Sequence, residues 1–405
     1  MYRSRHAESL LARYLSLFPC VAITGPRQSG KSTLVRQALP DLPYVSFDDP
    51  DEELAFRNDP KGFLGRFPGR VILDEVQRVP ELFRYLKISI DAAPTTMGRF
   101  VITGSNQLSF GKGVSESLAG RIGLLRLLPF ERAELPPELR ARQILFGSYP
   151  TLAMRNYEGA REWFSSYLGT YLERDIRLVF DIGKLSDFQI LLRLLAARTS
   201  QEQNIASLAR EIGVSSHTVE HWISVLEASS ITFSLAPFHA NLGKRLIKRP
   251  RLYFWDSGLA CHLTGLRDME ALEGGPLGVP LFENLVIAEL LKDSLHGGRD
   301  RDFWFYRDNS GGEIDLIVHD KSARHVSFLE IKSGRTAKVE WAERLERTVN
   351  IVRPAFEGRG LSFASAIIYR GQSKANWPKL GFSFVNAEEV GAAGMDPLFP
   401  VSPVT

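Results

Sequence analysis

The stretch Gly25-Pro-Arg-Gln-Ser-Gly30-Lys31-Ser32 decides how the first part of this chain folds. It fits the phosphate-loop pattern G-x-x-x-x-G-K-[ST] at every fixed position. A short apolar run, residues 21–24, comes before it, and a stretch of helical character, residues 32–39, follows and stops at Pro40. We therefore expect a strand, a glycine-rich turn and a helix, with the N–H groups of the turn and the helix N-terminus facing a phosphate.

The side chains of this loop predict the contacts of a nucleoside triphosphate. Lys31 is expected to reach the β- and γ-phosphates, and the Ser32 hydroxyl to coordinate Mg²⁺. ATP and Mg²⁺ are thus the predicted cofactors, and the predicted ATP-binding residues are Gly25, Pro26, Gln28, Ser29, Gly30, Lys31, Ser32 and Thr33.

A second apolar run, residues 71–73, ends in two acids. Asp74 is expected to hold Mg²⁺ through water, and Glu75 to polarise the attacking water as general base. Such a run is common by itself, but together with the loop it indicates an ATPase. Further strands are predicted at 44–47 and 100–103 and a helix at 81–92, and this alternation favours a parallel α/β sheet.

Two more candidates follow the fourth predicted strand. We favour Ser105 over Thr103 and Asn106 as the side chain that contacts the γ-phosphate, and a plain turn built by Gly104 is the alternative. Arg121 is a candidate for neutralising charge in the transition state, in cis or from a neighbouring subunit. A surface ion pair explains Arg121 equally well.

The middle of the chain is helical and contains a helix-turn-helix pattern. Residues 205–213 and 214–226 predict two helices joined at a small residue, Gly213, with Ser215 or Ser216 as the cap of the second. Residues 231–238 would form a wing. The exposed side of the second helix would present Ser216, His217, Glu220 and His221 to a DNA groove.

A basic run follows the wing and makes DNA the predicted partner. It contains five basic residues, of which the first four are the predicted DNA contacts: Lys244, Arg245, Lys248, Arg249 and then Arg251. Such modules also serve as protein contacts, and a basic run is also compatible with a solvated face, so a protein partner stays open.

A group of carboxylates and a lysine follows near the C-terminus. Residues 312–318 and 328–332 read as two strands, and a period of two puts Glu330 and Lys332 on one face. Asp315 and Glu330 would together hold Mg²⁺, which prefers oxygen ligands, and Lys332 would orient or deprotonate water. Glu283, on a helix that begins near Phe282, would add a further ligand.

Length and composition restrict the class of protein to which this chain can belong. The chain has 405 residues, a net charge of +3 and two cysteines, Cys20 and Cys261, which suits several globular domains and gives no disulfide framework. It has neither an apolar run long enough to span a membrane nor a signal core at residues 1–13. We therefore expect a cytoplasmic protein that does not act at a membrane.

These motifs taken together resemble a known family. Residues 25–32, 47–50, 73–78, 102–105 and 117–121 look like the AAA-type ATPase domain that precedes a DUF4143 region, and residues 171–176, 253–256, 281–284 and 312–315 look like the second part of that family. The carboxylates and the lysine resemble a PD-(D/E)xK nuclease core, although Ile314 stands where the motif has proline.

The resemblance implies an α/β chain of five segments. A P-loop NTPase domain with a parallel sheet (1–132) would be followed by a helical region (133–198), a winged-helix-like module (199–250), a restriction-endonuclease-like α/β domain (251–390) and a tail (391–405). It implies an AAA+ ATPase that couples ATP turnover to binding, remodelling, branch migration or cleavage of DNA, and a ring of subunits if Arg121 acts in trans. The rival hypothesis is a nucleotide-gated switch for a protein partner, with an inactive nuclease-like domain.

Overall fold

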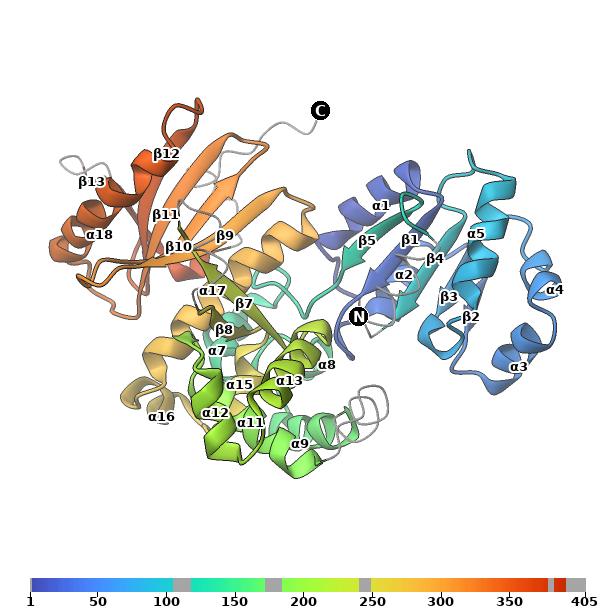
Figure 1. Ribbon diagram of the computed structural model, residues 1–405, viewed down its shortest axis with the longest axis horizontal. Coiled ribbons are helices and arrows are strands. Elements are labelled where there is room, and N and C mark those ends of the chain that lie inside the picture. The colour runs from blue at the N-terminus through green and yellow to red at the C-terminus, as the bar shows by residue number, and fades with distance from the viewer. Residues whose placement is uncertain (1, 105–117, 172–183, 240–248, 378–381, 391–405) are drawn as a thin grey trace.

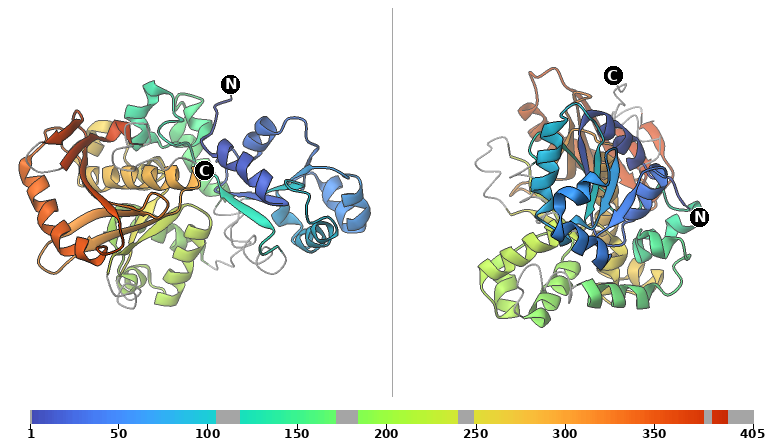
Figure 2. Two further views of the ribbon diagram at one scale, coloured as in Figure 1. Left: turned by 90° about the horizontal axis from the view of Figure 1, so that it is seen from above. Right: turned by 90° about the vertical axis from the view of Figure 1, so that its right-hand side faces the viewer.

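The computed structural model describes residues 2–104, 118–171, 184–239, 249–377 and 382–390 (Figure 1). The first and last parts of the chain form the two ends of an elongated molecule, each built around its own sheet (Figures 1 and 2). Ser105, residues 240–248, which hold most of the predicted basic run, and the predicted tail at 391–405 lie outside the described residues. No helix within the described ranges is both long and apolar enough to cross a membrane.

Five parallel strands form the N-terminal sheet in the order β2-β3-β4-β1-β5. The fully buried sequences of β1, β3 and β4 are typical of parallel strands that helices cover on both faces. The predicted parallel α/β sheet is therefore confirmed, with one strand, β5, that the sequence analysis did not find. The strands are β1 Cys20–Thr24, β2 Tyr44–Ser46, β3 Val71–Asp74, β4 Phe100–Gly104 and β5 Ile122–Arg126.

Helices cover both faces of this sheet. On one face α1 (Ala7–Leu17) and α2 (Lys31–Ala38) bury apolar side chains such as Leu11 and Leu34 against β1 and β4. On the other face lie α3 (Pro50–Asn58), α4 (Pro60–Gly65) and α5 (Leu82–Ala92). The short η1 (Val76–Arg78) lies between β3 and α5 in the chain. The helix predicted at 81–92 is confirmed within one residue.

The helical middle contains the predicted pair of helices. Helix α12 (Ile205–Ile212) ends at Gly213, whose φ of 82° is left-handed, and α13 (Ser216–Ala228) begins after it. The Ser215 hydroxyl accepts a hydrogen bond from the Thr218 N–H at 3.0 Å, which confirms one of the two predicted caps. Before this pair lie η2 Pro137–Arg142, α7 Gln143–Phe146, α8 Pro150–Ala153, α9 Ala160–Tyr171 and α11 Leu185–Ala197.

A nine-stranded sheet joins the second half of the chain in the order β13-β14-β12-β11-β10-β9-β7-β8-β6. Because β7 pairs antiparallel with β8, the expected boundary at 250/251 cuts through a hairpin. The strands are β6 Gln201–Glu202, β7 Thr232–Pro237, β8 Arg251–Phe254, β9 Arg301–Arg307, β10 Glu313–Asp320, β11 His325–Lys332, β12 Ser362–Tyr369, β13 Lys374–Trp377 and β14 Phe382–Asn386.

One hydrophobic cluster joins segments throughout this half, from Leu128 to Val390, and a second cluster, which includes Phe328 and Leu345, lies in the same half. The segments that the sequence separated into a helical region, a winged-helix-like module and a nuclease-like domain therefore pack as one body. Its remaining helices are α15 Ser257–Leu263, α16 Met269–Gly274, α17 Gly278–His296, α18 Val339–Val352, η4 Arg353–Ala355 and η5 Ala387–Glu389.

Candidate functional site

Two glycines shape the phosphate loop between β1 and α2. Gly25 has a φ of +145°, and a Cβ there would lie 2.0 Å from the carbonyl oxygen of Leu127. Gly30 has a φ of +94° and caps the N-terminus of α2. Both positions therefore exclude side chains, and the loop turns tightly enough for the N-terminus of α2 to face a bound anion.

Lys31 is buried beneath this loop. Its ammonium donates hydrogen bonds to the carbonyls of Gly25 at 3.0 Å and Pro26 at 2.9 Å. Burial lowers the pKa of Lys31 to about 8, and the charges of Glu75 and Asp74 oppose this shift. The lysine thus lies within electrostatic reach of both predicted acids, as the ATPase prediction requires.

Asp74 is fixed by hydroxyl groups from two neighbouring strands. Tyr44, at the start of β2, donates a short hydrogen bond to one carboxylate oxygen, and Thr103, on β4, donates one to the other. Burial and this hydrogen bond raise the pKa of Tyr44 to about 12. Sequence analysis missed Tyr44 and ranked Thr103 below Ser105; only the pairing of β2, β3 and β4 brings these hydroxyls to Asp74.

Glu75 has a left-handed backbone, with a φ of 56°. The Gln77 side-chain amide donates a short hydrogen bond to its carboxylate. Burial raises the pKa of Glu75, although Lys31 opposes the shift. The backbone of Glu75 is thus strained and its carboxylate has a raised pKa. Both features, beside a phosphate loop, suit a general base.

The oxygen groups near the loop fit a magnesium ion. Tyr44 bonds Asp74 and also lies within hydrogen-bonding range of Ser32, so the three side chains are contiguous. Hydroxyl and carboxylate oxygens are the ligands that Mg²⁺ prefers. Ser32 and Asp74 are therefore the residues that would hold the ion, with Tyr44 and Thr103 orienting the Asp74 carboxylate.

The N-terminal segment holds the loop from the side. Arg5 is buried and donates to the carbonyls of Ser29 at 2.9 Å and Leu128 at 2.8 Å, while pairing with Glu134 at 3.0 Å. Gln28 accepts a hydrogen bond from Thr151 of α8 at 3.1 Å. No motif marks these contacts in the sequence, because their partners lie more than 20 residues away.

A pocket of about 210 Å³ adjoins the phosphate loop. It shares Gly30 and Thr33 with the loop and is walled by residues of the N-terminal segment, of the stretch after β5 and of α8: Tyr2, Arg3, Arg5, Phe130, Pro150, Thr151 and Met154. Its aromatic and apolar walls beside the phosphate site offer room for part of a nucleoside.

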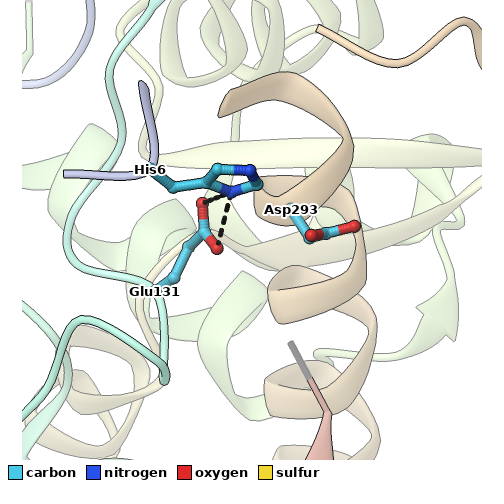
Figure 3. Close-up of side chains that lie close together, drawn as sticks. All are labelled: His6, Glu131 and Asp293. Carbon is cyan, nitrogen blue, oxygen red and sulfur yellow. Dashed lines mark hydrogen bonds and ion pairs between the residues drawn. The ribbon is translucent and has the colours of Figure 1, made fainter. Parts of the chain in front are cut away.

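A buried carboxylate, Glu131, links the N-terminal segment to the end of α17 (Figure 3). It accepts hydrogen bonds from Nδ1 of His296 at 2.6 Å and of His6 at 3.1 Å. Nε2 of His296 accepts the Leu128 N–H, so the ring carries its proton on Nδ1. The nearby Asp293 pairs with Arg299 and Arg301, whose charges oppose a cation here, so the cluster acts as a structural tie.

Arg121 lies at the opposite edge of the sheet from the phosphate loop. It precedes β5, whose first residue, Ile122, faces Cys20, whereas the loop follows Thr24. Five strand residues span about 16 Å, so the expected cis role of Arg121 in its own ATP site is wrong. Arg121 forms a surface ion pair with Asp91 at 2.7 Å, and a role in trans stays a prediction.

Arg126, at the other end of β5, connects the ATPase sheet to α13. Its guanidinium donates to the Ser230 hydroxyl at 3.0 Å and to the Glu227 carbonyl at 3.4 Å. It also lies over the ring of Trp255 at 4.9 Å. Since Leu127, the next residue, touches Gly25, this contact joins the phosphate loop to the helix-turn-helix.

The second predicted site forms where β10, β11 and α17 meet. Asp315 accepts the Ile331 N–H at 2.8 Å, and Lys332 forms a short ion pair with Glu330. Burial, and after it the charge of Asp315, raise the pKa values of Glu283 and Glu330 to about 8. The structure thus brings the four predicted residues together, and the helix of Glu283 begins at Gly278.

These carboxylates fit a divalent cation by their chemistry. One oxygen of Glu330 is buried and has no hydrogen-bond partner among the described residues. Mutual repulsion raises the pKa of each acid, and a bound cation would relieve it. Glu313, which the sequence analysis did not select, adds a fourth carboxylate.

Arg251 is buried and does not belong to an exposed basic surface. The sequence places it at the end of the basic run, but it is only 4% exposed and lies among the carboxylates of this cluster. It forms a short ion pair with Glu313 and lies 3.6 Å from Glu283 and 3.9 Å from Asp315. Arg249 is exposed, as predicted, whereas Lys244, Arg245 and Lys248 lie outside the described residues.

Comparisons with known proteins match three family models along the chain. A family model described as an AAA domain matches residues 18–135, and two domains of unknown function, DUF8612 and DUF4143, match residues 138–270 and 280–386. Uncharacterized proteins of Mycobacterium bovis and Mycobacterium tuberculosis are each 32% identical to this chain over 342 residues, which are 84% of this chain and 76% of each relative.

Solved structures with similarity to the chain include P-loop ATPases. The Walker-type ATPase Paby2304 of Pyrococcus abyssi has a TM-score of 0.45 and 16% identity, over 65% of this chain and 96% of its own. The RuvB Holliday junction branch migration motor of Thermotoga maritima has a TM-score of 0.27 and 17% identity, over 56% of this chain and 88% of its own.

Proposed function

Because this chain belongs to the family in which an AAA-type P-loop ATPase domain precedes a DUF4143 domain, we propose that it hydrolyses ATP with Mg²⁺ and couples turnover to action on DNA. The observation that carries the ATPase part is the convergence of Lys31, Asp74 and Glu75 at one edge of the sheet. Residues with these charges in this place bind phosphates and activate water.

The residues divide the work of hydrolysis among them. Lys31 binds the terminal phosphates, and Ser32 with Asp74 would hold Mg²⁺, which neutralises phosphate charge when bound. Thr103 and Tyr44 keep Asp74 oriented. Glu75 accepts the proton of the attacking water, for which its raised pKa is suitable. The nucleoside would extend into the pocket beside Gly30 and Thr33.

Two features support coupling to DNA. The helix-turn-helix exposes Ser216, His217, Glu220 and His221, the side chains proposed to face a groove. Arg126 connects this unit to the phosphate loop through Leu127, so a change of loop position on hydrolysis would be transmitted to α13. Arg249 and the three basic residues before it are the proposed phosphate contacts, and a ring of subunits would use Arg121 in trans.

Steady-state ATP hydrolysis tests this function, measured in Mg²⁺ with and without single-stranded, duplex and branched DNA. Glu75→Gln should keep ATP binding and lower turnover by about 10²- to 10⁴-fold, the usual contribution of a general base. Lys31→Ala should lose binding itself. Stimulation by one form of DNA would identify the substrate, and turnover that ignores every DNA would refute the coupling.

A second candidate function rests on Arg251. Its ion pairs with Glu313 and Glu283 neutralise the carboxylate cluster from within, which favours a nuclease-like domain without cleavage activity. The chain would then be a nucleotide-gated switch that binds a protein partner. Calorimetry with Mn²⁺ and a plasmid-nicking assay separate the two: cation binding and nicking that Asp315→Asn abolishes support the nuclease, and the absence of both supports the switch.

A further inference from the structure

Two pockets on the helical middle join into one groove. They have volumes of about 320 Å³ and 240 Å³ and share Ser165 of α9 and His262 of α15. The first is also lined by Arg161 and Arg267, and the second by Arg193 of α11. We call this the α9–α15 groove, and none of its lining residues belongs to the predicted ATP site or to the carboxylate cluster.

The groove carries positive charge that no acid among the described residues pairs with. Arg161, Arg193 and Arg267 are all exposed, and none of their guanidinium groups bonds or pairs with any described residue. No aspartate or glutamate lines either pocket. Other surface arginines of this chain, such as Arg66 and Arg78, pair with acids. Three unpaired guanidinium groups around one concave surface attract an anion.

The positive charge of the groove affects the pKa of His262. Its ring stacks on Phe164 at a centroid distance of 5.4 Å. Burial lowers the pKa of His262, and the charges of Arg161 and Arg193 lower it further. No carboxylate of the described residues raises the pKa of His262, which agrees with arginines that lack a paired acid in the part of the chain that the structure describes.

We propose that the α9–α15 groove binds the sugar–phosphate backbone of a DNA single strand. The arginines come from three separate segments along an elongated groove, which suits successive phosphates better than one small anion. The side chains of Ser165 and Gln189 offer neutral hydrogen bonds, and apolar side chains such as Phe146 and Leu168 offer surface to sugars and bases. This inference rests on the proposed action on DNA and gives it a binding surface that does not involve residues 244–249.

The test uses the full-length chain and a fluorescently labelled single-stranded oligonucleotide, with anisotropy measured at several salt concentrations. The triple variant Arg161→Ala, Arg193→Ala, Arg267→Ala removes three phosphate contacts, which should make the slope of log affinity against log salt less steep by about 2. Wild type should then lose about 20-fold more affinity than the variant over a fourfold rise in salt. The matched control replaces three other exposed arginines, Arg13, Arg84 and Arg347, and should bind as wild type does.

The outcomes distinguish a failure of the proposed groove from a failure of the proposed action on DNA. Unchanged affinity and slope in the triple variant would overturn the groove and leave action on DNA in place. No binding by wild type would overturn both. Groove-dependent binding of a polyglutamate peptide, with none of the oligonucleotide, would overturn DNA as the ligand. ATP hydrolysis without DNA should stay at the wild-type rate in both triple variants, which verifies their fold.

Discussion

Replacing Glu131 by glutamine tests how the N-terminal segment is held to α17. Burial raises the pKa of Glu131, but the hydrogen bonds from His296 and His6 outweigh it and lower the pKa from 4.5 to about 2. Each unit corresponds to about 1.4 kcal/mol, so the ionised carboxylate stabilises the fold by about 3 kcal/mol. Its side chain is only 2% exposed, so solvent screens this contribution little.

The sign of the pH dependence follows from the two shifts. A lowered carboxyl pKa gives stability that is complete above pH 4.5 and is lost as the pH falls toward 2. The hydrogen bond to Glu131 raises the pKa of His6, which gives stability that is complete below pH 6.5 and is lost as the pH rises through the raised value. The advantage of wild type over Glu131→Gln should therefore be largest between about pH 4.5 and 6.5.

Urea unfolding of both proteins from pH 2 to 9 measures this difference in free energy. Glu138→Gln, at an exposed glutamate of η2, is the matched control and should unfold as wild type at every pH. A difference between wild type and Glu131→Gln that is the same at pH 3 and pH 6 would refute the reasoning, because it would show that ionisation of Glu131 contributes nothing.

Three further changes have definite expected outcomes. Thr103→Val removes the hydroxyl that donates to Asp74. It should lower ATP turnover by roughly tenfold, because that is about the contribution of one hydrogen bond to a charged group, while ATP binding measured by calorimetry stays near wild type. Arg126→Met should leave basal turnover intact and abolish any stimulation by DNA, since it cuts the link to α13; stimulation at the wild-type level would contradict that link. Ser215→Ala removes the cap of α13 and should cost about 1 kcal/mol of unfolding free energy in urea titrations, whereas the exposed Ser224→Ala should cost less.

The phosphate loop could be predicted because its function depends on consecutive residues. A loop that closes on phosphate needs glycine at fixed spacings, and Gly25 and Gly30 have the φ values that exclude other residues. The acids after β3 were predictable for a similar reason, because a buried strand that ends in acids places them at the carboxyl edge of a parallel sheet. Local geometry and local sequence coincide at these positions.

The positions of Arg121 and Arg251 could not be predicted from local sequence. The sequence left Arg121 open between the ATP site and a surface ion pair and placed Arg251 in the basic run, but the direction of β5 places Arg121 at the far edge of the sheet. The pairing of β8 between β7 and β6 buries Arg251 among carboxylates from α17 and β10. An isolated strand does not indicate which end or face meets a distant site, because that depends on its partners.

The sequence by itself determined the ATP-binding loop, the parallel sheet around it and the helix-turn-helix, since each is specified by residues within one or two turns or strands. Tertiary structure alone decided the contacts of Arg5, Tyr44 and Arg126, and the packing of the segments of the second half against one another. The physical reason is that charges and hydroxyl groups act over a few ångströms in space, and only the packing of distant segments sets those distances.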